Sequence, residues 1–254
     1  MAKWLASLAL AGMLACAAQA SPSPTRIIVS NSDGGRLVGF IERVLTDAYA
    51  QVGATPEIRT YPVARSIEMA NEGTTDAEAW RGPGLDRDYP NLIRVPEPIL
   101  TLEYRAYTLE KPFPGRDWDS LRGHRVCVNL GEKLIEDRTH DLPRELAHGV
   151  DAALKMLKAG RCDVVLSNQF AWLAMDHSDL GTFCVGAAAI ETIPLYHYVN
   201  RRHADLVPGL ASAFKTLRGN GTLERYLEAD PDEILLTKAR ARHECGGSKG
   251  AAPR

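Results

Sequence analysis

The sequence predicts an α/β protein made of two lobes that are joined by two extended crossings. In residues 25–92, short β-branched segments alternate with amphipathic helical segments, and the same alternation starts again after residue 117. One extended apolar segment (93–110) leads out of the first unit, and a second (193–203) leads back. Strand–helix alternation is typical of parallel sheets covered by helices. Two crossings between two such units are typical of a hinged, bilobal molecule.

The first twenty residues have the layout of a secretory signal. They contain a single lysine, Lys3, then an apolar stretch too short to span a bilayer, and an A-x-A site that ends at Ala20. We therefore expect cleavage after Ala20 and a periplasmic location. The chain has 30 basic and 32 acidic residues, a net charge of −2, which argues against nucleic acid or an anionic membrane as a partner.

In the first unit, the apolar periodicity of residues 36–52 predicts a helix that Gly53 ends. Residues 57–61 follow as a strand, and Pro62 suits the first turn of a helix that ends at Gly73. The segment 75–80 completes a β-α-β-α-β order after the β-branched run at 25–30.

The second unit contains predicted strands at 125–130, 162–168 and 182–190. Predicted helices lie at 132–138, 150–160 and 169–175, and two more, 204–221 and 222–228, follow the second crossing. In parallel α/β sheets, ligands bind at the carboxyl ends of the strands. The loops at such ends are 30–35, 60–65, 78–84, 129–132 and 166–170, and we expect them to line one cleft.

Four cysteines follow the signal segment. Cys127, Cys162 and Cys184 fall in predicted strands, so in an oxidising compartment a disulfide among these three is expected, with its pairing left open. Cys245 lies in a polar, Gly-rich end that is predicted to be disordered. The cysteine and histidine spacings match no zinc site, and we expect neither metal nor cofactor.

Three stretches, "PVARSIEMANEGTTDAEAWR", "WDSLRGHRVCVNLG" and "LKMLKAGRCDVVLSN", occur in this order. In order and spacing they resemble the periplasmic solute-binding proteins of family 3, the amino-acid-type receptors of ABC importers, over residues 25–235. The resemblance implies the periplasmic binding protein fold, closing on a small polar ligand. It implies a first lobe of 21–106 plus 198–254, with a disordered tail from about 239, and a second lobe of 107–197.

The resemblance also implies ligand-binding positions. An arginine after the third strand holds the ligand's carboxylate in such receptors, and Arg81 and Arg87 both suit this role here. An acid is usual where Asn168 stands, and an amide cannot neutralise an ammonium group. Glu78, Ala79 and Trp80 replace the usual serine/threonine cluster. In the second lobe, Glu132 follows Gly131 where a small residue is usual.

Each candidate also has a structural interpretation. Asp33 either caps the next helix or reaches the ligand, and Arg65 lies either on a helix surface or in the cleft. Trp80 either anchors the core or stacks on the ligand, Asn168 either caps a helix or bonds the ligand, and Arg81 is either a solvated loop residue or an anion clamp.

The hypothesis is a monomeric receptor that captures a small, carboxylate-bearing ligand for the permease of an ABC importer. No catalytic motif is present. Two alternatives stay open. One is a dehydratase-like enzyme on the same fold, with Glu78 as acid/base and Arg81 as clamp. The other is a module that presents its ligand to a membrane sensor.

Overall fold

The computed structural model describes residues 25–32, 37–130, 132–172 and 180–245. In the first lobe, strands and helices alternate as the periodicity predicts. These elements are β1 (Thr25–Ser32), α1 (Val38–Ala50), β2 (Ala54–Tyr61), α2 (Val63–Glu72) and β3 (Ala77–Arg81). Gly73 ends α2 in the left-handed conformation that favours glycine. The 3-10 turn η1 (Leu85–Arg87) then leads to the first crossing strand, β4 (Leu92–Thr108).

The second lobe follows β4. After the 3-10 turn η2 (Asp119–Leu121), it contains β5 (Val126–Asn129), α3 (Lys133–Arg138), β6 (Arg144–Ala147), α4 (Val150–Lys158), β7 (Val164–Asn168) and β8 (Cys184–Val185). The return strand β9 (Glu191–Asn200) precedes η3 (Arg201–Leu206), α6 (Val207–Gly219), α7 (Thr222–Glu228) and α8 (Pro231–His243).

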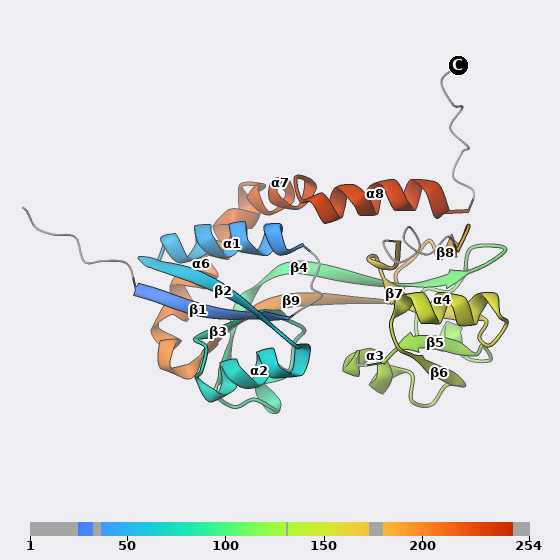
Figure 1. Cartoon of the computed structure of the whole chain (residues 1–254), viewed down its shortest axis with the longest axis horizontal. Coiled ribbons are helices and arrows are strands. Elements are labelled where there is room, and N and C mark those ends of the chain that lie inside the picture. Colours follow the sequence, from blue (N-terminus) through green and yellow to red (C-terminus); the bar gives the residue numbers. More distant parts are fainter. Residues whose placement is uncertain (1–24, 33–36, 131, 173–179, 246–254) are drawn as a thin grey trace, which may run out of the picture.

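Within the described residues, nine strands form one continuous sheet in the order β2-β1-β3-β9-β4-β7-β5-β6, and β8 pairs with β4. The pairs β1–β2, β1–β3, β5–β6 and β5–β7 are parallel, in agreement with the predicted strand–helix alternation. The long antiparallel pair β4–β9 connects the two lobes (Figure 1). The crossings predicted at 93–110 and 193–203 are therefore these two strands.

The pairing directions place the carboxyl ends of the parallel strands of both lobes face to face. β4 runs from the first lobe into the second, and β7 is antiparallel to it, so β7 and its parallel neighbour β5 end toward the first lobe. β9 runs the opposite way, and β3 is antiparallel to it, so β3 and β1 end toward the second lobe. Figure 1 shows the two groups of strands, β1 to β3 and β5 to β7, toward opposite ends of the crossing strands β4 and β9. This is the arrangement in which open α/β sheets bind ligands.

Each lobe has its own hydrophobic core. The first-lobe core lies between the sheet and the helices α1, α6 and α7, and it includes Phe40, Ile41 and Phe214. In the second lobe, Leu154 and Trp172 belong to one cluster, and Leu121, Val128 and Ile135 to another. The two lobes thus bury separate apolar clusters, which is the condition for a hinge between them.

The C-terminal helix α8 contacts both lobes. Asp230 accepts a hydrogen bond from the backbone N–H of Phe40 at 2.6 Å, in the first lobe. Leu236 and Ala239 pack into the core of the second lobe, and Figure 1 shows α7 and α8 along one side of both lobes. The assignment of all of 198–254 to the first lobe therefore needs a correction at α8. The predicted disorder from about residue 239 is also wrong as far as Cys245, because the helix runs to His243.

Two disulfides join the four cysteines of the described chain. Cys127 in β5 is bonded to Cys162, just before β7, as expected for cysteines in neighbouring strands. Cys184 in β8 is bonded to Cys245, directly after α8, a pairing that the sequence did not predict. The second disulfide fastens the end of α8 to the second lobe.

Three further elements differ from their predictions. β6 was not predicted, because three of its four residues are partly or fully exposed and two of these are charged. The strand predicted at 182–190 is only the two-residue β8. Of the helix predicted at 169–175, Ala171 and Trp172 are helical, and residues 173–175 lie outside the described residues.

Candidate functional site

A bulge at the end of β3 brings Glu78 and Arg81 together. Glu78 pairs with Tyr198 of β9, and Arg81 pairs with Tyr196, so three steps along β3 oppose two along β9. In a regular strand, residues three apart point to opposite faces. The extra residue places both side chains on the same side, and the Arg81 Nη2 lies 2.6 Å from the Glu78 Oε1. Glu78 and Arg81, the two charged residues of β3, therefore form one ion pair at the end of the strand that faces the second lobe.

Glu78 is fully buried, and three groups surround its carboxylate. The hydroxyls of Ser30 and Ser66 donate to Oε2 at 2.7 and 2.6 Å, and Arg81 pairs with Oε1. Burial raises the pKa of Glu78, and the Arg81 guanidinium and the two hydroxyls oppose that rise. The Arg81 side chain keeps 17% of its surface exposed. In the resulting cluster, the buried Glu78 carboxylate holds the partly exposed guanidinium of Arg81 in place.

Trp80 lies on the core side of the bulge. Its ring is 6.2 Å from the ring of Phe40, and only 8% of the residue is exposed. The buried His197 contacts the carbonyl of Ala79, the residue before Trp80, through Nδ1 at 3.0 Å, and it contacts the Tyr49 hydroxyl through Nε2 at 2.8 Å. Because a carbonyl only accepts, Nδ1 carries the proton, and Nε2 accepts from Tyr49. These contacts agree with the interpretation of Trp80 as a core anchor, and they fix the bulge.

The end of β1 adds a buried amide. Asn31 is fully buried, and neither its Oδ1 nor its Nδ2 has a hydrogen-bond partner within the described part of the chain. Such a group is costly and calls for an explanation. Asp33, predicted as a helix cap or ligand contact, lies outside the described residues. The backbone N–H groups of Leu37 and Phe40 at the start of α1 are bonded instead by Asp232 and Asp230.

In the second lobe, Glu132 lies between the end of β5 and the start of α3. It is half-buried, its Oε1 accepts from the Asn129 amide at 3.2 Å, and its Oε2 is buried without a hydrogen bond from any described residue. Burial raises the pKa of Glu132; the Asn129 amide and the neighbouring Tyr104 hydroxyl oppose this rise in pKa, and the charge of Glu136 adds to it. The sequence had marked Glu132 only as an unusual residue.

Asn168 ends β7 and lies opposite Tyr104 of the crossing strand β4. Its Oδ1 accepts from the backbone N–H of Phe170 at 3.0 Å, and its Nδ2 contacts the Tyr104 hydroxyl at 3.4 Å. Asn168 thus caps the next turn and also borders the Glu132 group. Gly131, the remaining candidate of this lobe, lies outside the described residues.

The two other arginine candidates lie at the surface. Arg65 is half exposed on α2, where its guanidinium is 3.7 Å from Glu68, which agrees with the helix-surface interpretation. Arg87 is exposed in the 3-10 turn η1. Of the arginines considered for the carboxylate, Arg81 alone pairs with Glu78, within the described residues.

The residues that the sequence did not predict are mostly polar residues at strand ends. They are Ser30, Asn31, Ser66, Tyr104, Asn129 and Glu132. A signal existed for the first two, since "SNS" follows an apolar strand in the first loop considered. None existed for Ser66, which lies inside a helix.

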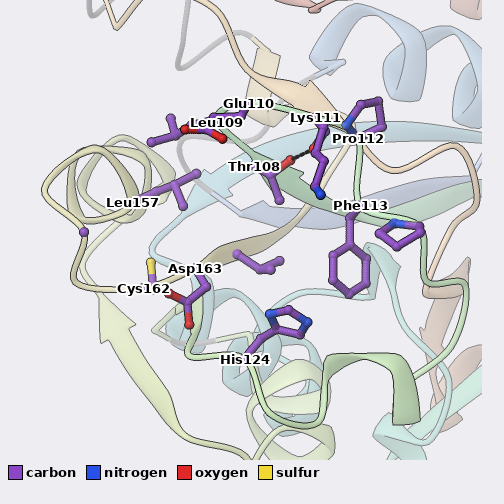
Figure 2. A pocket seen from close by; sticks show the side chains of 13 residues that line it. Thr108, Leu109, Glu110, Lys111, Pro112, Phe113, His124, Leu157, Cys162 and Asp163 are labelled. Atoms are coloured by element: carbon purple, nitrogen blue, oxygen red, sulfur yellow. Dashed lines mark hydrogen bonds between the residues drawn. The ribbon is translucent and has the colours of Figure 1, made fainter.

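A separate pocket of about 570 Å³ lies in the second lobe (Figure 2). Residues 108–114 form one wall, and Leu157, Cys162 and Asp163 lie opposite. The ring of Phe113 contacts that of His124 edge-on, with the centroids 5.3 Å apart. This pocket includes none of the residues of the facing strand ends.

Comparisons with known proteins agree with this geometry. No protein-family model matches the sequence. A protein of Shewanella oneidensis whose name assigns no function is 24% identical over 240 residues, which cover 85% of this chain and 91% of the relative. Among solved structures, a probable amino-acid ABC transporter extracellular-binding protein of Bacillus subtilis superposes with a TM-score of 0.64 at 16% identity, covering 81% of this chain and 97% of that one. The chain has the periplasmic binding protein fold.

The same fold also occurs in a sensor. A histidine kinase sensor domain with similarity to periplasmic binding proteins has a TM-score of 0.61 at 17% identity, covering 88% of this chain and all of that domain. The predicted fold class is thus confirmed. In the described part of the molecule, no helix is long and apolar enough to cross a membrane.

Proposed function

We propose that this chain is a periplasmic receptor that captures a small, carboxylate-bearing ligand between its two lobes and delivers it to an ABC importer. The observation that carries the proposal is the Glu78–Arg81 cluster at a strand end that faces the second lobe. A guanidinium at this position offers planar donors to a carboxylate, and Glu78 holds it in place before the ligand arrives. The crossing strands β4 and β9 supply the hinge.

The surroundings of Glu78 favour binding over catalysis. A general base must reach a proton on its substrate. Both oxygens of Glu78 are already engaged, by Ser30, Ser66 and Arg81, and the side chain is fully buried. The dehydratase-like alternative assigned the acid/base role to this residue, and this environment argues against it.

Delivery to a membrane sensor is the second candidate, favoured by the likeness to the histidine kinase sensor domain. Both candidates share the binding step and differ in the partner of the closed form. Uptake of the labelled ligand that is lost in a deletion strain supports the importer, whereas unchanged uptake with a lost transcriptional response supports the sensor.

The binding step is tested with Arg81→Lys. Lysine keeps the charge that compensates Glu78 but loses the planar fork, so the fold should persist while the affinity for a carboxylate falls about 10- to 100-fold. Arg87→Lys, an equal change at an exposed arginine, is the matched control. Isothermal titration with amino acids and small organic acids measures both variants. An equal loss in the two variants, or no binder among the carboxylates, would contradict the proposal.

A further inference from the structure

The C-terminal helix α8 is fastened to the first lobe at its start. The buried Asp230 accepts a hydrogen bond from the backbone N–H of Phe40 at 2.6 Å, and Asp232 accepts from the backbone N–H of Leu37 at 2.7 Å. Both donors lie at the start of α1, where backbone N–H groups have no partner within the helix. Arg43 of α1 lies 3.7 Å from Asp230 as well. The start of α8 therefore moves with the first lobe.

The other end of α8 is fastened to the second lobe. Leu236 and Ala239 are buried in the apolar cluster of that lobe. Directly after the helix, Cys245 forms the disulfide with Cys184 of β8, and its backbone N–H donates to the Phe183 carbonyl at 2.8 Å. A covalent bond thus adds to the packing at this end, and α8 is tied to both lobes.

The position of α8 relative to the crossing strands decides what this tie restricts. Figure 1 shows α8 on one side of β4 and β9, and α2 and α3 on the other side. A rotation about the crossing strands that brings α2 and α3 together therefore separates the parts of the lobes that hold the two ends of α8. A helix of 13 residues is about 20 Å long and keeps its length, because its backbone hydrogen bonds are internal. With both ends fastened, α8 opposes the rotation as a third connection between the lobes.

The two disulfides differ in location and in access. Cys127 and Cys162 are both buried, and they join neighbouring strands within the second lobe. In the other pair Cys184 is buried, whereas Cys245 is only half-buried. The rate of thiol–disulfide exchange depends on the access of the attacking thiolate to a sulfur atom. A reductant from solvent should therefore open the disulfide that holds α8 first.

We propose that the Cys184–Cys245 disulfide is a redox-sensitive latch on the movement of the lobes. While it is closed, α8 restricts that movement; when a dithiol reduces it, the end of α8 is released. A thiolate of the dithiol attacks the Cys245 sulfur, the S–S bond breaks, and Cys184 leaves as a thiolate that takes up a proton. The second thiol then displaces Cys245, so the dithiol becomes a disulfide and the protein gains two electrons and two protons. The inference rests on the proposed receptor function, since closure is the movement that the latch restricts.

The test measures the distance between the lobes without a ligand. Nitroxide labels on genetically encoded keto side chains replace the exposed Glu72 of α2 and the exposed His140 after α3. Double electron–electron resonance should give a narrow distance distribution for the oxidised protein, and a wider one for Cys184→Ala/Cys245→Ala and for the wild type after mild dithiothreitol treatment. Hydrogen exchange in the last turns of α8 should become at least about tenfold faster in both, because a disulfide contributes more than one decade to a local equilibrium.

Cys127→Ala/Cys162→Ala is the matched control, since it removes a disulfide that lies within one lobe. It should lose stability in urea unfolding but keep the narrow distance distribution, and alkylation with mass spectrometry should find Cys184 and Cys245 reduced before the other pair. An unchanged distribution in the latch variant, or equal widening in both double variants, would overturn the latch. Reduction of the buried pair first would overturn its redox sensitivity. A wild-type protein that binds no carboxylate would contradict the proposed function instead, and it would leave these distances unaffected.

Discussion

Replacing Arg81 by methionine removes the guanidinium that compensates a fully buried carboxylate. Methionine keeps much of the apolar length of the side chain, so the main loss is the countercharge at 2.6 Å from Glu78. Removing one member of a buried ion pair costs about 3–5 kcal/mol, because the other charge stays desolvated. Since folded domains are stable by about 5–15 kcal/mol in total, we expect a large drop in the urea midpoint at pH 7.

The pH dependence of this variant identifies the cause. Burial already raises the pKa of Glu78, and without Arg81 the pKa should rise further. A carboxyl with a raised pKa in the folded state binds more protons than in the unfolded state, so its destabilisation is present at high pH and is relieved as the pH falls through the folded-state pKa. The stability difference between wild type and Arg81→Met should therefore shrink between pH 7 and pH 5.

The control is the double variant Glu78→Gln/Arg81→Met, which removes both charges. It should recover a large part of the lost stability, and its difference from the wild type should not shrink at low pH. A single variant that is as stable as the wild type, or a deficit that is the same at pH 7 and pH 5, would refute the assignment of Glu78 as a buried, ionised partner of Arg81.

Three further predictions concern the framework of the site. Burial lowers the pKa of His197 to about 4. The unfolded state therefore binds a proton that the folded state does not, and the free energy of unfolding falls as the pH drops from about 6.5 to about 4. In urea unfolding, His197→Gln should reduce this fall in stability by about 3 kcal/mol. Cys245→Ser opens a loop of 61 residues and should cost about 4 kcal/mol in the chain-entropy model, and an unchanged thermal midpoint would contradict a native disulfide with Cys184. Asp230→Ala removes the acceptor for the Phe40 N–H and should cost about 0.5–2 kcal/mol by the same assay, whereas the exposed Asp141→Ala should change little.

Apolar periodicity was sufficient to predict most of the first lobe. The helical spacing of apolar residues in 36–52 corresponds to α1, whose buried face includes Phe40, Ile41 and Val44. α8 was missed because it has little amphipathic character: among its described residues, Leu236 and Ala239 are the ones buried in the apolar cluster of the second lobe. Asp230 followed by Pro231 is nevertheless a helix-start signal, and it was present in the sequence.

The candidate site could be proposed from the sequence as a place in the fold, but its contacts could not. Glu78 and Arg81 could be singled out because they interrupt an apolar strand, but their pairing depends on a bulge that no residue type in β3 signals. Ser66 could not be linked to Glu78, because a helix and a strand meet there through tertiary packing. The disulfide between Cys184 and Cys245 was missed for the same reason, since it depends on the path of α8.

The Glu78–Arg81 ion pair changes what the proposed receptor can select by charge. An isolated arginine would attract any small anion, whereas Arg81, compensated by Glu78, has little net charge to offer at long range. In the proposed receptor, its contribution to binding would be the geometry of its donors, which discriminates planar carboxylates from other anions only at contact. In the proposed receptor the second lobe completes the site, so recognition of the ligand would depend on closure. The hinge strands β4 and β9, together with α8 and its disulfide to β8, then limit affinity as much as the contact residues do.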